Sequence, residues 1–347
     1  MLHIGIDVHK QESQICWLDT TTGETRQRRI ETRRERFEAV LGPGPRGQVV
    51  IEAGTESEWV AQAIEAVGHV VVVVDPNYGP MYPRPRGQRH KNDVRDAEAL
   101  ARASAHGTYR PAHRASAWAR QGRQWLTTRE TLVRTRTRVV SVVRATLRGA
   151  GLRVPSGAAE TVAARVRALA LPAALAPVVE PLLALLEAVE TQVATADAAV
   201  ADLARGHTTI QRLRTVPRVG VLTSLAFVAT LDTVERFQDA QQVTSYLGLV
   251  PRDDSSGTRR RAGHISKRGP TRLRYLLVQA AWGILFGPEV RDLPLRRWAE
   301  RVASRRGRAI AAVALARRLA RILFALWRDE TRFDPQQGGR GPARAAA

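Results

Sequence analysis

The chain has 347 residues, enough for two or three domains with buried cores. Its 54 Lys and Arg residues outnumber its 33 Asp and Glu residues, and the resulting net charge of +21 favours a polyanionic partner. The single cysteine, Cys16, excludes a disulfide framework, so we expect a cytoplasmic protein. A signal peptide is not expected, because the N-terminus has no basic region leading into an apolar core. A membrane span is not expected either, because prolines and acids interrupt the most apolar tract, 169–189.

The first stretch, Leu2–Lys10, alternates apolar and polar residues, which predicts a strand with Asp7 on its polar face. Further strands are predicted at 13–20, 25–32, 48–52 and 69–74, and helices at 33–41 and 57–67. Three successive strands followed by alternating helices and strands predict an α/β domain over residues 1–110 with a five-stranded mixed sheet, the ribonuclease H-like layout. In that layout the first and fourth strands are neighbours.

Four carboxylates fall at the ends of these elements. Glu52 ends the fourth strand, so strand neighbourhood predicts that it lies beside Asp7. Asp93 and Asp96 open a helix predicted over 93–105, and their spacing of three places both on one face. Carboxylates converging from two strands and a helix suit Mg²⁺. The alternative is that each acid is an ordinary terminal carboxylate, of the kind that the helix macrodipole favours.

The middle of the chain, residues 111–206, is predicted to be helical with a coiled coil. Residues 115–149 carry an apolar stripe at heptad spacing and arginines on the remaining surface. Residues 180–203 alternate apolar steps of four and three over about three heptads and contain no Lys or Arg. Such an acidic helix is expected to pair either with the Arg-rich helix of its own chain or with its copy in a second subunit, and we favour the second.

A mainly helical C-terminal domain is predicted over 207–330. A Pro-x-x-Gly turn within 213–227 is similar to a helix-hairpin-helix, whose backbone amides bind phosphates. Further on, a Ser-Ser-Gly loop precedes cations able to hold a phosphate, namely Arg259, Arg260, Arg261, His264, Lys267 and Arg268. Residues 331–347 are expected to be a disordered tail. The histidines show no metal-ligand spacing and are assigned to the surface or the core.

Three segments of the first domain carry a resemblance to a known family: Gly-Ile-Asp-Val-His-Lys at 5–10, Ile-Glu-Ala-Gly-Thr at 51–55 and Lys-Asn-Asp-Val-Arg-Asp-Ala at 91–97. They resemble the motifs of the DEDD-type insertion-sequence transposases, which have a RuvC-like N-terminal domain and are similar to the Piv-type DNA invertases. The resemblance extends over 219–281. It implies that the acidic tetrad of the family is Asp7, Glu52, Asp93 and Asp96.

The resemblance also implies a mechanism. In that family the serine directly before a glycine is the nucleophile, which places it at Ser256, with Ser255 as the fallback. Attack on a DNA phosphate forms a transient phosphoserine bond, and the four acids hold Mg²⁺. The implied partners are double-stranded DNA and a structured noncoding RNA that guides target choice. Because exchanging two DNA partners requires more than one active centre, we expect a homodimer or homotetramer.

Three other interpretations remain open. A RuvC-like resolvase uses the same acids with water as the nucleophile and does not need Ser256. A structural DNA-binding protein needs neither centre. An inactive element copy keeps the acids without the activity.

Overall fold

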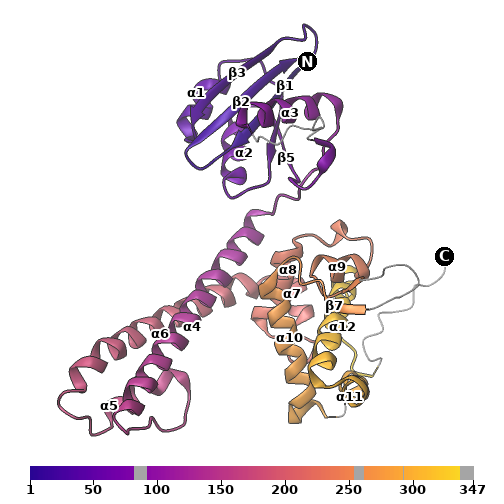
Figure 1. Ribbon diagram of the computed structural model, residues 1–347. Helices are drawn as coiled ribbons and strands as arrows, with labels where there is room; N and C mark the ends of the chain where they lie inside the picture. Colours follow the sequence, from indigo (N-terminus) through magenta and orange to yellow (C-terminus); the bar gives the residue numbers. More distant parts are fainter. Residues whose placement is uncertain (82–91, 254–261, 292, 337–347) are drawn as a thin grey trace. The chain divides into compact units, whose positions relative to one another are not determined.

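The computed structural model describes residues 1–81, 92–253, 262–291 and 293–336 (Figure 1). The chain divides into two compact units, Met1–Arg114 and Ala115–Ala347. The finer division expected from the sequence stays a prediction. Within the described ranges, each helix is too short or too polar to cross a membrane.

The first unit is built on a five-stranded mixed sheet. Its strand order is β3-β2-β1-β4-β5, where β1 is Leu2–Val8, β2 Glu12–Asp19, β3 Thr25–Glu31, β4 Gln48–Glu52 and β5 Val70–Val74. Strand β1 pairs antiparallel with β2 and parallel with β4, and β4 pairs parallel with β5. The predicted sheet is therefore confirmed, including the neighbourhood of the first and fourth strands.

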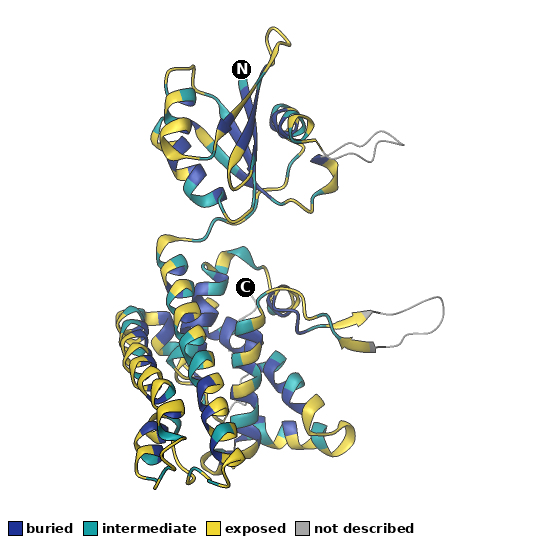
Figure 2. Cartoon of the chain, turned by 60° about the vertical axis from the view of Figure 1, so that its left-hand side comes forward, coloured by how far each residue is buried: buried dark blue, intermediate teal, exposed yellow. Residues whose placement is uncertain are grey.

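Helices cover both faces of this sheet (Figure 1). Helices α1 (Arg34–Leu41) and α2 (Ser57–Ala66) pack on the face that carries Ile4 and Ile6. Helix α3 (Asp93–His106) packs on the other face, across β1 and β2. Strands β1, β2 and β4 are largely buried between these layers, whereas the edge strand β3 is mostly exposed (Figure 2). Because successive side chains alternate, the helix α3 face receives the other residues of β1, which are His3, Gly5 and Asp7.

The second unit begins with a long helical hairpin. Helix α4 (Ala117–Gly149) runs out, α5 (Val162–Arg167) lies near the turn, and α6 (Ala176–Arg205) returns beside α4 (Figure 1). Two interhelical ion pairs, Arg129 with Asp197 and Arg136 with Glu190, are seven residues apart on each helix but run in opposite directions. The two helices are therefore antiparallel and in register.

The apolar seam of α6 is buried against α4 of the same chain. Val189, Val193 and Val200 are all less than a tenth exposed, and the outer end of the seam packs with Val143 and Leu147. The structure thus shows the intramolecular alternative for this seam, rather than pairing with a second copy. The expected homo-oligomer stays a prediction. The apolar seam of α6 is not evidence for it, because this seam is buried within one chain.

The remaining helices form a second bundle around Phe227 and Phe324. In chain order they are α7 (Thr208–Leu213), α8 (Val221–Leu231), α9 (Ala240–Tyr246), α10 (Thr271–Phe286), α11 (Pro294–Arg306) and α12 (Arg308–Arg328). Short 3₁₀ turns in the two units lie at Gly79–Met81, Ala159–Thr161, Val234–Arg236 and Pro288–Val290. Phe333 is also buried in this core, so the described residues 331–336 do not belong to a free tail.

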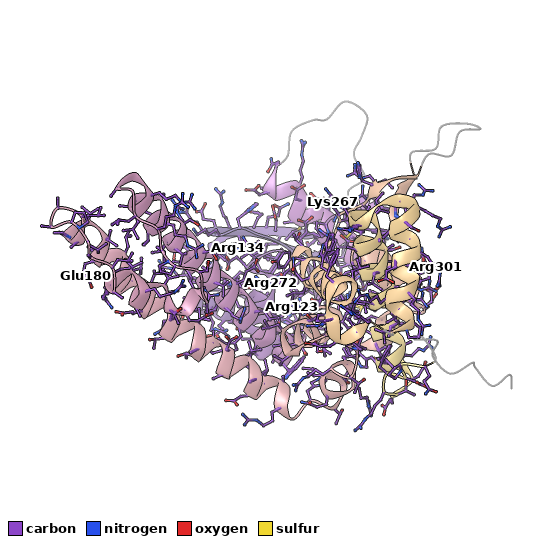
Figure 3. The ribbon with its side chains drawn as sticks, turned by 90° about the horizontal axis from the view of Figure 1, so that it is seen from below. Arg123, Arg134, Glu180, Lys267, Arg272 and Arg301 are labelled. Atoms are coloured by element: carbon purple, nitrogen blue, oxygen red, sulfur yellow. The ribbon has the colours of Figure 1, made fainter. Side chains whose placement is uncertain are left out.

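Cations fasten the hairpin to this bundle. Arg123 of α4 donates hydrogen bonds to the carbonyls of Ala229 and Thr230 at the end of α8, at 2.7 and 3.2 Å. Arg272 of α10 pairs with Glu130 of α4 (Figure 3). Much of the excess arginine is therefore structural: it caps carbonyls and neutralises acids inside the unit.

Candidate functional site

The position of α3 depends on one glycine. Gly5 lies at the centre of β1, and a Cβ atom there would overlap the carbonyl oxygen of Ala97 and the amide nitrogen of Ala101. Helix α3 therefore contacts the strand backbone directly, an approach that only glycine permits. The segment Gly5-Ile6-Asp7 therefore determines how closely α3 approaches β1, and it also carries the Asp7 carboxylate two residues after the glycine.

Two more side chains hold α3 in place. His3, one pleat before Gly5, is buried and its Nδ1 lies 2.9 Å from the hydroxyl of Ser104. Burial lowers the pKa of His3, with the N-terminal charge and His106 acting in the same direction. Cys16, opposite Gly5 on β2, packs against the same helix, and burial raises the pKa of its thiol to about 11. The thiol is therefore a packing group and not a nucleophile.

The first turn of α3 brings acids to the carboxyl end of β1. Asn92 caps the helix, since its side-chain oxygen accepts a hydrogen bond of 3.0 Å from the amide of Val94. Asp93 and Asp96 both lie in the first turn, where the macrodipole favours negative charge. Gly107, in the left-handed region at φ 64°, ends the helix. The predicted helix is confirmed within one residue.

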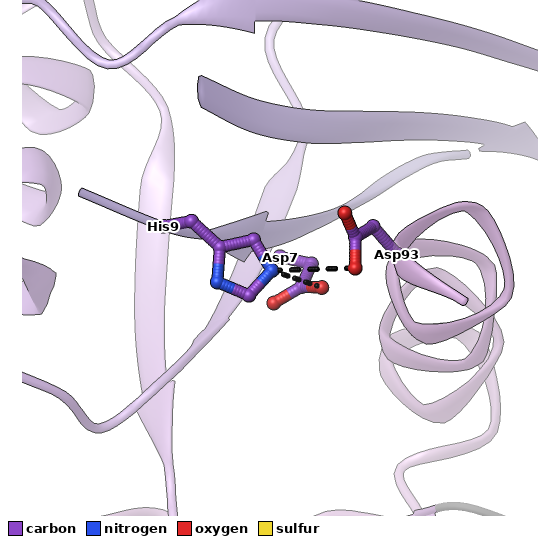
Figure 4. A group of neighbouring side chains, drawn as sticks. All are labelled: Asp7, His9 and Asp93. Atoms are coloured by element: carbon purple, nitrogen blue, oxygen red, sulfur yellow. Dashed lines mark hydrogen bonds and ion pairs between the residues drawn. The ribbon is translucent and has the colours of Figure 1, made fainter. Parts of the chain in front are cut away.

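Three side chains form a tight group at this point, Asp7, His9 and Asp93 (Figure 4). The Nε2 atom of His9 lies 3.1 Å from Oδ2 of Asp7 and 3.4 Å from Oδ1 of Asp93. One ligand atom from each residue lies within 4.8 Å of the others. Asp7 is 5% exposed, whereas His9 is nearly half exposed. The group thus consists of one buried carboxylate, Asp7, and two partly exposed side chains, His9 and Asp93.

Strand register extends this group across the sheet. Gln14 pairs with Asp7 across β1 and β2, and Arg29 pairs with Gln14 across β2 and β3. Arg29 reaches back to Asp93, with its Nη2 atom 3.7 Å from Oδ2. A cation on the sheet and the helix terminus therefore both offset the charge of Asp93.

The other two predicted acids lie at the same end of the domain. Glu52 is the last residue of β4, one position beyond the Ile6–Ile51 pair, which places it beside Asp7 as expected. Asp96 is one helical turn after Asp93. Both are partly exposed. Neither belongs to the group of ligand atoms within 4.8 Å of one another in the described residues.

His9 is the residue that sequence reasoning missed. Every histidine was assigned to the surface or the core, whereas His9 lies between two of the predicted acids. The signal that could have found it was its spacing of two from Asp7, because alternate residues of an extended segment share a face. Two carboxylates and an imidazole are a donor set that fits a divalent cation.

The serine loop is described only at its base. Ser255, Ser256, Arg259, Arg260 and Arg261 lie outside the described residues. Strands β6 (Pro251–Asp253) and β7 (Ala262–Ile265) pair antiparallel on either side of that segment. Of the predicted cations, His264, Lys267 and Arg268 are described, and all three are exposed, His264 within β7 and the other two just after it.

The two ends of this hairpin are held together by two glycines. Gly248 and Gly269 both have positive φ, 65° and 78°. A Cβ on Gly248 would overlap the carbonyl of Arg268, and one on Gly269 would overlap the carbonyl of Tyr246. The segments that precede and follow the hairpin therefore touch backbone to backbone, which requires glycine on both sides.

Arg274 closes this hairpin base. It is 9% exposed, and its guanidinium donates hydrogen bonds to the carbonyls of Leu247, Lys267 and Arg268 at 2.8 to 2.9 Å. Burial lowers its pKa. One cation thus binds carbonyls from both ends of the hairpin, an arrangement that the planar guanidinium suits. The family-like segments around residues 246–251 and 263–274 meet here.

A mixed sheet in the order β3-β2-β1-β4-β5, crossed by α3 and carrying acids at one end, defines a ribonuclease H-like DEDD domain. A family model described as "Transposase", for DEDD enzymes, matches residues 4–151, and one described as "Transposase IS116/IS110/IS902 family" matches residues 210–293. The chain belongs to this family of insertion-sequence transposases.

Full-length relatives support this membership. A Pseudomonas aeruginosa protein described as a "Probable family 20 transposase" is 31% identical, over 96% of this chain and 98% of its own. The transposase for insertion sequence element IS1111A of Coxiella burnetii is 29% identical, over 94% of this chain and 90% of its own. The transposase for IS1328 of Yersinia enterocolitica is 28% identical, over 95% and 98%.

Proposed function

We propose that this chain is a DNA transposase that cuts and rejoins DNA strands to move an insertion sequence. The observation that carries the proposal is the meeting of Asp7, His9 and Asp93 at the end of a ribonuclease H-like sheet, in a member of a transposase family. The net charge of +21 supports a polyanionic substrate.

The four acids Asp7, Glu52, Asp93 and Asp96 are the proposed ligands of Mg²⁺. The bound ion supplies charge neutralisation at a phosphodiester and activates a reacting oxygen. Asp7 suits this role because a buried carboxylate needs a compensating cation. His9 holds the Asp7 and Asp93 carboxylates around one nitrogen atom.

Ser256 is the proposed nucleophile, with Ser255 as the fallback. Its Oγ forms a bond to phosphorus while the bond from phosphorus to the leaving strand breaks, and that strand keeps the oxygen and takes up a proton. A hydroxyl of a second strand then displaces the serine, so no ATP is consumed. The hairpin base formed by Gly248, Gly269 and Arg274 supports the proposal, because it anchors both ends of the segment that carries the serine.

The proposed partners follow from this reaction. Double-stranded DNA is the substrate, with backbone contacts from Arg259, Arg260, Arg261, Lys267 and Arg268. A structured noncoding RNA supplies target choice. A homodimer or homotetramer provides more than one active centre for strand exchange, with contacts outside the α4–α6 seam.

A denaturing gel tests the chemistry. Purified protein is incubated with Mg²⁺, supercoiled DNA carrying the joined element ends, and the flanking noncoding RNA. Wild-type protein is expected to give a protease-sensitive protein–DNA adduct, and Ser256→Ala is expected to lose it while Ser255→Ala keeps it. EDTA is expected to abolish cutting, and omission of the RNA is expected to abolish target choice.

The other outcomes of this gel decide against parts of the proposal. Cut DNA without an adduct shows that water is the nucleophile. An adduct lost in Ser255→Ala but kept in Ser256→Ala moves the nucleophile by one residue. If the Asp7→Asn variant still cuts DNA, the acidic group takes no part in the reaction.

A further inference from the structure

The second unit contains a large groove, and of the residues that line it the proposed function uses only Lys267. It has a volume of about 1320 Å³ and lies between strand β7, the end of α11 and one face of α12. We call it the α12 groove. Its described lining carries six Lys or Arg side chains and no Asp or Glu: Lys267, Arg306, Arg317, Arg318, Arg321 and Arg328.

The floor of the α12 groove is apolar. Ile310 is 55% exposed, and Val313, less than one turn further along α12, and Trp298 of α11 also line the groove. The guanidinium of Arg318 lies over the Trp298 ring, 4.7 Å from its centroid. An exposed isoleucine in a hollow surrounded by arginines indicates a ligand with both apolar faces and negative charge.

These cations differ from those of the α4–α6 hairpin. In the hairpin, Arg129 and Arg136 are paired with acids of the facing helix. In the described part of the chain, no carboxylate lies within 4 Å of the cationic groups of Arg306, Arg317 or Arg321. Charge that the described acids do not neutralise favours an anionic partner at this surface.

Arg317 shows a second sign of a missing partner. Its Nη2 donates to Oε1 of Gln241 at 2.9 Å, but among the described residues its buried Nε has no hydrogen-bond partner. A buried donor left unpaired costs about 1–3 kcal/mol.

We propose that the α12 groove binds a single nucleic-acid strand, with phosphates at the arginines and unpaired bases on the apolar floor. A duplex keeps its base faces stacked inside and exposes phosphates, sugars and base edges, so it has no base face to place on the apolar floor. A single strand exposes base faces, and basic grooves with apolar or aromatic floors bind such strands without reading their sequence. Arg317 and Arg321 are four residues apart, about 6 Å along the helix, so they can contact successive phosphates.

This inference gives the proposed transposase a place for a strand that has left its duplex. It rests on the proposed function only for the choice of nucleic acid over another polyanion. The groove includes Lys267, immediately after the hairpin that leads to Ser256. A strand held there lies in the same unit as the proposed nucleophile.

The test is a fluorescence anisotropy titration of the full-length protein with labelled oligothymidylate, which does not pair with itself, and with a duplex of equal length. EDTA is present, so the acid site takes no part. Arg321→Glu is the charge variant, Ile310→Ser is the floor variant, and Arg301→Glu is the matched control. Arg301 is exposed on α11, outside the groove lining (Figure 3).

Arg321→Glu is expected to weaken oligothymidylate binding about tenfold and to reduce its salt dependence by about one counterion. Ile310→Ser is expected to weaken it about threefold and to leave duplex binding unchanged. Arg301→Glu is expected to stay within about twofold of wild type. Equal losses for Arg301→Glu and Arg321→Glu, or equal losses on duplex and single strand for Ile310→Ser, overturn the proposal. So does displacement of oligothymidylate by polyglutamate at lower concentration than by unlabelled oligothymidylate, which identifies an acidic polypeptide as the ligand.

The same titration separates this inference from the proposed reaction. Ser256→Ala and Asp7→Asn are expected to bind oligothymidylate as wild type does. If wild-type protein forms no adduct with DNA but Arg321→Glu and Ile310→Ser still show their selective losses, the reaction is wrong and the groove stands. If the adduct forms and neither variant affects binding, the groove is wrong and the reaction stands.

Discussion

The two candidate centres are held in place by different physical means. At the acid site, regular elements fix the carboxylates, because α3 touches the backbone of β1 at Gly5 and so brings Asp93 to Asp7. At the hairpin base, irregular backbone is fixed by one buried guanidinium and two glycines. Like charges need a rigid support to stay close, and the acid site has one in the contact between α3 and β1.

Replacing Asp7 by Asn should have the largest effect. It should show whether the Asp7 carboxylate acts in DNA cutting or only stabilises the fold. We expect DNA cutting to fall about a thousandfold, because a central ligand charge is lost while the side chain keeps its size. The fold should be retained, since fewer like charges meet at the end of β1. The measurements are strand cutting with Mg²⁺ and urea unfolding. Asp19→Asn, at the opposite end of the β1–β2 pair, is the control and should cut normally.

Replacing Gly5 by Ala tests the support of the acid site itself. The added methyl group overlaps the backbone of α3, so the free energy of unfolding should fall by about 3 kcal/mol. Cutting should fall as well, because α3 carries Asp93 away from Asp7. Gly54→Ala is the matched control, since no atom lies within 4 Å of the position that its added Cβ would take. Equal unfolding curves for the two variants would show that α3 does not depend on contact with β1.

Replacing Arg274 by Lys tests the hairpin base. An ammonium cannot reach the carbonyls of Leu247, Lys267 and Arg268 together, so we expect the free energy of unfolding to fall by about 2 kcal/mol. Local opening should rise more than global unfolding does. Hydrogen exchange reports this opening through the amide of Ser266, which donates to Val250 at 2.8 Å.

Arg272→Lys is the matched control for that variant. It lies two residues earlier on α10 and pairs with Glu130, an interaction that lysine can keep. Its exchange at Ser266 should equal that of wild type. If Arg274→Lys leaves this exchange unchanged, the glycine contacts alone hold the hairpin.

Much of the first unit follows from local sequence. The alternation around Asp7 predicted its face, and the order of elements predicted that β1 and β4 pair, so Glu52 was placed correctly at the same end. His9 could not be ranked among eight histidines, because its role depends on where α3 begins in space. The position of α3 depends on its contact with Gly5, which is distant in the sequence, so a local sequence pattern does not predict it.

The second unit was harder to predict for two reasons. The seam of α6 is an apolar heptad pattern that fits a partner helix from either source, and the choice of α4 depends on paired charges such as Arg136 with Glu190. Arg274 is one arginine among many, and only its burial beside three carbonyls distinguishes it. The net charge of +21 predicts a polyanionic partner, but it does not show which cations bind that partner and which pair with acids of the protein.

The smallest expected effect concerns pH and the packing of α3. Burial lowers the pKa of His3, so between its folded and unfolded values the unfolded chain binds more protons than the folded one. The stabilisation is therefore complete above the ordinary histidine pKa of 6.5 and is lost as the pH falls below it. His207, whose ring packs at a tilt against Trp118 in the second unit, has its pKa lowered by burial as well and contributes with the same sign.

Urea unfolding between pH 7.5 and 5.5, a range of about two units around the usual histidine pKa, distinguishes the two histidines. His3→Gln should flatten the pH dependence of the transition that involves the first unit, and it should leave that of the second unit unchanged. His207→Gln should do the reverse. The hydrogen bond between His3 and Ser104 ties α3 to β1 one pleat from Gly5. A pH dependence unaffected by His3→Gln would therefore mean that this end of α3 is already open to water in the folded chain. In that case the contact at Gly5 alone would bring Asp93 to Asp7.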